Sequence, residues 1–136
     1  GGSAGGNLCC SATLAMYNDQ FKHWFSDALT IKGYVPLYPA NDICRVEGVN
    51  SSEVFIDPKD QVDQYSPPCL IFQGTNDGLV NPKIQTHFKK AYEDNGNDNC
   101  GVIYLNLAAH AFDVYNSGYY YQLMVYYVER FLYSFR

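Results

Sequence analysis

The stretch Gly1-Gly2-Ser3-Ala4-Gly5-Gly6 opens the chain and fits the pattern G-x-S-x-G, with Ser3 at its centre. Small residues on both sides of a serine are needed where a strand turns sharply into a helix. Such a turn forces the serine into a strained backbone conformation and holds its Oγ exposed, and bulky neighbours do not fit around it. The pattern therefore predicts a nucleophile elbow with Ser3 at its tip.

The residues that follow distinguish this elbow from a flexible linker, in which short Gly-Ser-Gly runs also occur. Between Asn7 and Tyr17, apolar residues recur at helical spacing. They are Leu8, Cys9, Ala12, Ala15 and Met16. A helix directly behind the turn is what an elbow requires.

The composition is that of a globular domain. The 136 residues are 47% hydrophobic and 17% charged, enough for one domain with a modest core. The net charge is −5 and no basic patch is present, so we expect no nucleic-acid partner. No apolar run is long enough to cross a bilayer. Because a complete chain would first need the strand that feeds the elbow, we also expect a longer protein that extends before Gly1.

Cysteines and acidic residues give no sign of a metal site. The five cysteines, Cys9, Cys10, Cys44, Cys69 and Cys100, form no C-x-x-C pair, and we expect buried free thiols. This favours a reducing, cytoplasmic compartment without fixing it, since a sequon at Asn50 points toward secretion. Asp57, Asp60 and Asp63 have no histidine partner and are expected on a solvated surface.

Strand and helix patterns alternate along the rest of the chain. Strands are expected at residues 31–35, 69–72 and 102–107, a helix between Asn81-Pro82 and Asn95-Gly96, and an irregular connection with a short helical turn at residues 40–66. A tyrosine-rich helix ends the chain. Its expected buried side is Leu123, Tyr127, Val128, Phe131, Leu132 and Phe135. The alternation predicts an α/β fold, a parallel sheet with flanking helices on both faces.

Two polar side chains follow expected strands. Asp77 comes after the strand that ends near Phe72, and His110 after the one that ends near Leu107. The carboxyl ends of parallel strands meet at one edge of the sheet, so we expect both near Ser3. Taken alone, Asp77 in an Asn-Asp-Gly turn could be a turn residue and His110 a core histidine; His23 and His87, within helical stretches, are expected to be structural or solvent-facing. The combination of order and placement favours a site.

The three residue types suit nucleophilic catalysis. A serine hydroxyl needs a base to take its proton, which His110 would do. A carboxylate, Asp77, would hold the imidazole in the correct tautomer. The backbone N–H of Ala4, directly after Ser3, would donate to an oxyanion.

Three motifs together resemble the C-terminal half of an α/β-hydrolase of the esterase and lipase type, related to hormone-sensitive lipase. They are Gly-Gly-Ser-Ala-Gly-Gly-Asn-Leu, Pro-Pro-Cys-Leu-Ile-Phe-Gln-Gly-Thr-Asn-Asp-Gly-Leu-Val and Ala-His-Ala-Phe-Asp, and the resemblance extends over essentially all of residues 1–136. It implies that the chain is the C-terminal portion of one catalytic domain. It also implies hydrolysis of small-molecule carboxylic esters through an acyl-enzyme without a metal or cofactor, with Ser3 as nucleophile, Asp77 as acid and His110 as base.

The sequence departs from the family pattern at three points. The Gly-rich oxyanion motif is not within the chain, Gln73 stands where a histidine is usual, and Leu-Ala-Ala-His replaces Pro-Gly-Ala/Gly-His. Two alternatives remain open, a serine peptidase of the prolyl-oligopeptidase type and a catalytically silent hydrolase-fold binding module. The Ser-Ala-Gly-Gly form favours an esterase, and the presence of His110 argues against the silent module.

Overall fold

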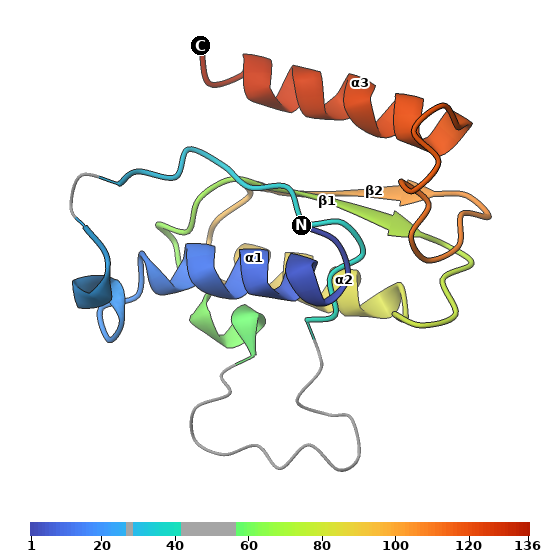
Figure 1. The fold of residues 1–136 in the computed structure, drawn as a ribbon. Coiled ribbons are helices and arrows are strands. Elements are labelled where there is room, and N and C mark those ends of the chain that lie inside the picture. Colours follow the sequence, from blue (N-terminus) through green and yellow to red (C-terminus); the bar gives the residue numbers. More distant parts are fainter. Residues whose placement is uncertain (27–28, 42–56) are drawn as a thin grey trace.

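A computed structural model describes residues 1–26, 29–41 and 57–136. Along these residues the elements are α1 (Ala4–Ala15), η1 (Lys22–Trp24), η3 (Pro58–Gln61), β1 (Cys69–Gly74), α2 (Lys83–Asp94), β2 (Cys100–Leu105) and α3 (Tyr119–Tyr133) (Figure 1). Apart from the strand expected at residues 31–35, the long helices and the strands follow the predicted order. Residues Cys44 and Asn50 lie outside the described residues.

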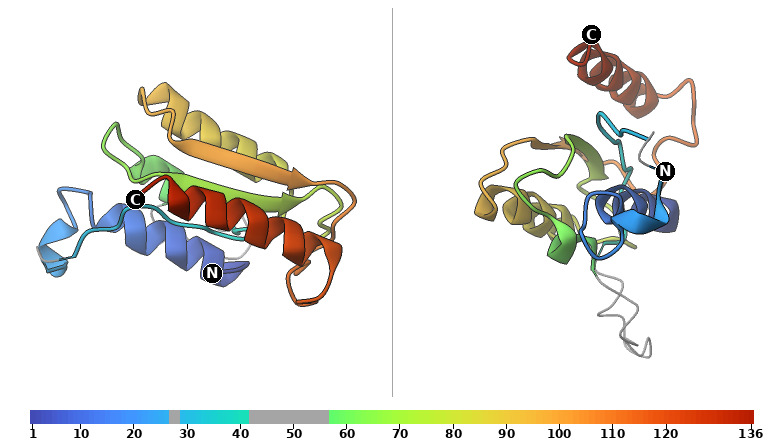
Figure 2. Two further views of the ribbon diagram at one scale, coloured as in Figure 1. Left: turned by 90° about the horizontal axis from the view of Figure 1, so that it is seen from above. Right: turned by 90° about the vertical axis from the view of Figure 1, so that its left-hand side faces the viewer.

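Strands β1 and β2 form a parallel pair, with Cys69 opposite Cys100 and Gly74 opposite Leu105. All six residues of β1 are buried, as expected for a strand covered on both faces. Figures 1 and 2 show α3 on one face of this sheet and α1 and α2 on the other. The predicted α/β fold with helices on both faces is confirmed.

An extended segment, residues 34–38, runs parallel to β1 on the side away from β2. The Leu70 N–H donates to the Tyr34 carbonyl at 3.0 Å, and the Phe72 N–H donates to the Pro36 carbonyl at 3.3 Å. This contact replaces the strand predicted at residues 31–35 and consists of isolated bridges. The physical reason is Pro36, which has no N–H to offer the Leu70 carbonyl, so one bond of the ladder cannot form.

The residues that lead into Ser3 lie on the other side of this segment. The Leu37 N–H donates to the Gly1 carbonyl at 2.8 Å, and the Ser3 N–H donates to the Leu37 carbonyl at 3.0 Å. The order across the sheet is therefore residues 1–3, segment 34–38, β1 and β2, all parallel. The carboxyl ends of these parallel segments therefore lie at the same edge of the sheet, where Ser3 is found.

Side chains of β1 alternate between two cores. Cys69 and Ile71 belong to the cluster beneath α1 and α2, which also holds Cys10, Leu14, Phe88 and Tyr92. Leu70 and Phe72 belong to the cluster beneath α3, with Tyr38, Leu105, Ala108 and Phe112. The two clusters fix the sheet between its helix layers.

The buried faces of two helices differ from what their apolar residues indicate. In α1, Leu8 is 67% exposed, whereas Cys10 and Leu14 are fully buried. The helix turns small and polar residues inward instead: a β-carbon on Gly6 would lie 3.0 Å from the Leu37 carbonyl oxygen, and the Asn7 amide donates to the Ala40 carbonyl. Apolar periodicity does not detect such a contact face.

In α3 the expected apolar side is only half-buried. Tyr127, Val128 and Phe131 pack against the core beneath the helix, but Leu132 is 56% exposed because it lies at the margin of this packed face. Two other expectations concern the segment before β1. A short helical turn is found there as η3, and Asp57 is buried as its N-cap, not solvated, because its carboxylate accepts the Lys59 N–H.

Candidate functional site

Ser3 stands at the turn between the incoming strand and α1. Its backbone has φ 54° and ψ −121°, and it is the N-cap residue of the helix. Positive φ is costly for a residue with a β-carbon and persists only where surrounding structure enforces it. Here the Ser3 N–H is bonded to the Leu37 carbonyl and the Ser3 carbonyl accepts the Asn7 N–H, both at 3.0 Å. The turn predicted from the glycine pattern is thus strained at the serine itself.

Asp77 follows β1 and is held by four hydrogen bonds. Its Oδ1 accepts the N–H groups of Leu79 and Val80, both at 2.9 Å. Its Oδ2 accepts from the side-chain amide of Gln73 at 3.1 Å and from Nδ1 of His110 at 2.8 Å. The side chain of Asp77 has no exposed surface. Sequence reasoning left open a role as a turn residue; the carboxylate forms these turn bonds and also contacts the histidine.

The hydrogen bonds keep the Asp77 carboxyl ionised. Burial by itself raises the pKa of this group, but the Val80 N–H, His110, the Leu79 N–H and Gln73 together outweigh burial and hold the pKa below its ordinary value of 3.8. An ionised carboxylate only accepts hydrogen bonds, so Nδ1 of His110 carries the hydrogen between them. In the neutral ring Nε2 is then the free acceptor.

His110 lies in the loop after β2 and points its other nitrogen at the serine. Its Nε2 is 3.0 Å from the Oγ of Ser3, and its side chain is 16% exposed. Leu107 and Ala111, three residues before it and one after it, both have positive φ, 60° and 58°. Four residues with a side chain have positive φ in the described part of the chain; besides these two they are Ser3 and Tyr38, which contacts His110. Backbone strain is therefore concentrated around this histidine.

The loops that carry Asp77 and His110 are bonded to each other. The Asn76 N–H donates to the Ala108 carbonyl at 3.0 Å, and the Leu107 N–H donates to the Thr75 hydroxyl at 2.8 Å. These bonds connect the two loops immediately beyond the paired strands. The sequence-predicted residues Ser3, Asp77 and His110 are all brought together, although 107 residues separate the first from the last.

The arrangement can move a proton away from a hydroxyl. The Ser3 hydroxyl donates to Nε2, and the carboxylate beyond Nδ1 stabilises the imidazolium that results. Ala4 is the first residue of α1, so no carbonyl four residues earlier in the helix takes its N–H. That N–H lies next to the serine at the positive end of the helix dipole, where a developing negative charge is favoured.

Two residues around the site have roles that sequence reasoning missed. Gln73 is fully buried and connects Asp77 to Gln85, whose amide donates to the Gln73 Oε1 at 3.0 Å. Tyr38 packs its ring against His110, with ring centroids 4.5 Å apart. Gln73 could have been found from the sequence, because it is a polar residue at the end of the apolar run 69–72. Tyr38 has no such signal, since it differs from other tyrosines only by its position between Pro36 and Pro39.

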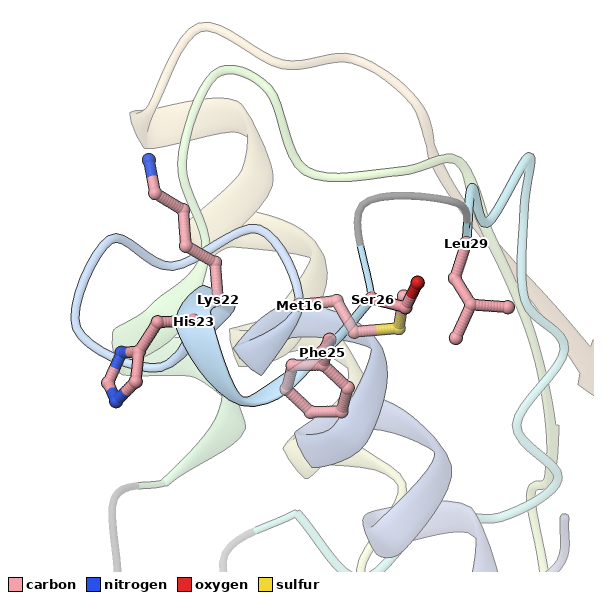
Figure 3. A pocket seen from close by; sticks show the side chains of 6 residues that line it. All are labelled: Met16, Lys22, His23, Phe25, Ser26 and Leu29. Atoms are coloured by element: carbon pink, nitrogen blue, oxygen red, sulfur yellow. The ribbon is translucent and has the colours of Figure 1, made fainter.

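A cavity of about 510 Å³ lies away from these residues, around η1. Figure 3 shows its lining side chains, with Met16, Ser26 and Leu29 on one side and His23 turned away from them. Met16 caps the far end of α1 from Ser3, and a helix of 12 residues is about 18 Å long. His23 and His87 are exposed, as expected, and lie apart from the site formed by Ser3, Asp77 and His110.

Within residues 1–26, 29–41 and 57–136, no group of three or more His, Cys, Asp or Glu side chains could hold a metal ion. Over the same described residues, no helix has the length and apolar character to cross a membrane. Of the described cysteines, Cys10, Cys69 and Cys100 are buried thiols and Cys9 is half-buried; all are free. Burial raises the pKa of both Cys10 and Cys69, so these thiols stay protonated.

Comparison with known proteins finds similarity at the level of structure. No protein-family profile and no curated protein matches the sequence. Among solved structures, esterase 2 of Thermogutta terrifontis phosphorylated by paraoxon matches with a TM-score of 0.78 and 23% identity, over 99% of this chain and 52% of that one. The native form of the same esterase matches with a TM-score of 0.76 and 23% identity, over 99% and 53% of the two chains.

A carboxylesterase, Cest-2923 of Lactobacillus plantarum, has a TM-score of 0.68 and 16% identity, over 82% of this chain and 44% of that one. The chain thus spans about half the length of the structures it matches. At these identities the similarity shows the fold. The chain has the fold of the C-terminal part of an α/β-hydrolase.

Proposed function

We propose that this chain is the C-terminal portion of a single catalytic domain that hydrolyses carboxylic esters of small molecules. The observation that carries the proposal is the continuous chain of hydrogen bonds from Ser3 Oγ through the His110 ring to Asp77, with distances of 3.0 and 2.8 Å. Similar structures that are esterases support the same reaction class.

The proposed reaction begins when Ser3 Oγ attacks the ester carbonyl carbon and His110 Nε2 takes the hydroxyl proton. The carbonyl oxygen, which becomes negatively charged, accepts a hydrogen bond from the Ala4 N–H. Collapse of this intermediate breaks the bond to the alcohol, which leaves with the proton from His110. Water then attacks the acyl-serine, gives its proton to His110, and releases the acid and the free Ser3 hydroxyl.

Asp77 acts through the histidine in this scheme. Its lowered pKa keeps it negative throughout the neutral range, so it stabilises the imidazolium formed in each half of the reaction. The peptidase alternative is not favoured, since the similar structures are esterases.

The experiment that tests this function uses an organophosphorus probe, because one similar esterase is phosphorylated by paraoxon. The full-length protein and its Ser3→Ala variant are treated with a fluorophosphonate, and the labelled peptide is identified by mass spectrometry. We expect labelling at Ser3 and hydrolysis of short-chain p-nitrophenyl esters, both lost in Ser3→Ala. A matched control is Ser11→Ala, which changes a serine within α1. Labelling that survives Ser3→Ala would contradict the assignment.

A further inference from the structure

Tyr38 contacts the histidine of the site from segment 34–38. Its ring is tilted by 59° against the ring of His110, with centroids 4.5 Å apart, and it also meets Phe112 edge-on at 5.3 Å. The Tyr38 hydroxyl donates to Oδ1 of Asp113, three residues after His110 in the same loop. The tyrosine is therefore bonded to the loop whose histidine it touches.

The position of Tyr38 is fixed by its backbone and by the segment that leads into the elbow. Its N–H donates to the Phe72 carbonyl of β1 at 2.7 Å, and its φ is 35°, a strained value. Next to the hydroxyl lies Gly2, where an added β-carbon would be 2.7 Å from the Tyr38 Oη. Because Gly2 has no side chain, the Tyr38 hydroxyl has room beside it. The tyrosine thus contacts three segments at once: β1, the residue before Ser3, and the loop of His110.

The hydroxyl of Tyr38 is a neutral donor under working conditions. Burial raises its pKa, and the hydrogen bond to Asp113 and the negative charges of Asp113 and Asp77 raise it further. The residue is 5% exposed. A hydrogen bond from a hydroxyl to a carboxylate is stronger than one between neutral groups. The bond to Asp113 is therefore suited to holding the ring in one orientation.

The histidine needs such a support because its two hydrogen bonds do not define its orientation fully. Bonds at Nδ1 and Nε2 lie close to the plane of the ring, so a tilt out of that plane changes only their angles and is resisted weakly. The Tyr38 ring, whose centroid is 4.5 Å from that of the imidazole, restricts such a tilt by direct contact. When Ser3 carries an acyl group, its hydroxyl no longer donates to Nε2, and the contacts with Asp77 and Tyr38 then hold the imidazole.

We propose that Tyr38 and Asp113 form a brace that fixes the ring orientation of His110, which makes both of them positioning residues. The inference rests on the proposed function for its catalytic consequence. The brace serves proton transfer by His110, so loss of the brace lowers kcat in both half-reactions and leaves substrate binding unchanged. Tyr38 and Asp113 would thus support Ser3, His110 and Asp77 without touching the substrate.

The test compares Tyr38→Phe, Asp113→Ala and Asp113→Asn in the full-length protein. Tyr38→Phe keeps the ring and removes the donor, and we expect kcat to fall about tenfold with KM within about twofold, since small misplacements of catalytic groups cost up to 10²-fold. Asp113→Ala should match it, and the double variant should be no slower than either single variant. Asp113→Asn keeps an acceptor oxygen and should recover most of the rate.

Tyr120→Phe is the matched control. Tyr120 also donates its hydroxyl to the segment after β2, to the Asn106 carbonyl at 2.6 Å, and it contacts Phe112 but is not in ring contact with His110 in the described structure. Its kcat should stay within about twofold of the wild type. Equal losses in Tyr120→Phe and Tyr38→Phe would overturn the brace, because they would show general loosening. Additive losses in the double variant, or an unchanged kcat in Tyr38→Phe, would overturn it as well.

A second measurement separates this inference from the proposed function. The proton on Nδ1 of His110 is observed by NMR with 15N-labelled histidine, and its exchange with water should be roughly tenfold faster in Tyr38→Phe, in line with the loss of positioning. Unchanged exchange would overturn the brace. Faster exchange in a protein without Ser3-dependent turnover would support the brace and contradict the proposed function alone.

Discussion

Gly74 and the carbonyl oxygen of Ala108 approach so closely that no side chain fits between them. A β-carbon on Gly74 would lie 2.2 Å from this oxygen, well inside van der Waals contact. The oxygen is also held from another direction, because it accepts the Asn76 N–H at 3.0 Å. Gly74 ends β1, three residues before Asp77, and Ala108 lies two residues before His110. The spacing of the two loops thus depends on the absence of one methyl group.

This contact leads us to expect that Gly74→Ala lowers both activity and stability. The methyl group must push the Ala108 carbonyl away, which lengthens the bond from Asn76 and moves His110 relative to Asp77. A shift of 1 Å at a catalytic group can cost on the order of 10²-fold in rate. We expect kcat for p-nitrophenyl esters to fall by about this factor and the midpoint of thermal unfolding to fall with it.

Gly78→Ala is the control for this substitution, since an added β-carbon there meets nothing within 4 Å. Its rate and melting midpoint should remain close to those of the wild type. If Gly74→Ala keeps the wild-type rate, the close approach does not set the loop spacing.

A second prediction concerns Gln73, which is fully buried. Its amide nitrogen donates to Asp77 Oδ2 and its Oε1 accepts from Gln85, whose amide also donates to the Pro39 carbonyl at 2.9 Å. Gln73→Leu should lower the free energy of unfolding by roughly 1–3 kcal/mol, because buried polar groups lose their partners. Urea denaturation measures the change.

A double variant tests whether Gln73 and Gln85 act together. In Gln73→Leu combined with Gln85→Leu, the loss of stability should be smaller than the sum of the two single losses by at least about 0.5 kcal/mol. Gln122→Leu, at an exposed position of α3, is the control and should change stability by less than about 0.5 kcal/mol. Strictly additive losses would show that the two glutamines are independent.

Much of the fold followed from apolar runs and special turns. The run at residues 69–72 predicts a strand covered on both faces, and β1 is buried along its whole length. The alternation of strands and helices predicts the parallel sheet. The glycine pattern predicts a strained serine, and Ser3 has φ 54°. These features depend on neighbouring residues in the chain, so local sequence patterns predict them.

Other features depend on contacts between distant segments and could not be predicted in this way. The inner face of α1 is built from Gly6, Asn7 and Thr13 as well as from apolar residues, so hydrophobic spacing predicts the helix but does not identify this face. Segment 34–38 pairs with β1 despite Pro36, which breaks the regular pattern. The contact of Tyr38 with His110 joins residues 72 positions apart through the elbow and a loop, and no local pattern indicates it.

The last prediction uses the pH dependence of stability to test the charge on Asp77. Its folded pKa lies below 3.8, its value without the protein around it, so the carboxylate stabilises the folded state above that pH. This contribution is lost as the pH falls through the folded pKa. In Asp77→Asn the amide oxygen still accepts the Leu79 and Val80 N–H groups, but no charge faces His110. The variant should therefore be less stable than the wild type at about pH 5, and the difference should shrink as the pH is lowered below 3.8.

Urea denaturation at several values between about pH 5 and pH 2.5 measures this difference, because this range extends on both sides of the ordinary aspartate pKa of 3.8. Asp98→Asn, at an exposed position of the loop before β2, is the control and should differ from the wild type by less than about 0.5 kcal/mol at each pH. At neutral pH, Asp77→Asn should lower kcat by about 10⁴, because an amide nitrogen facing Nδ1 favours the wrong tautomer of His110. A stability difference that stays constant or grows toward low pH would contradict a carboxylate held ionised by its hydrogen bonds, and with it the tautomer that leaves Nε2 free to accept the proton of Ser3.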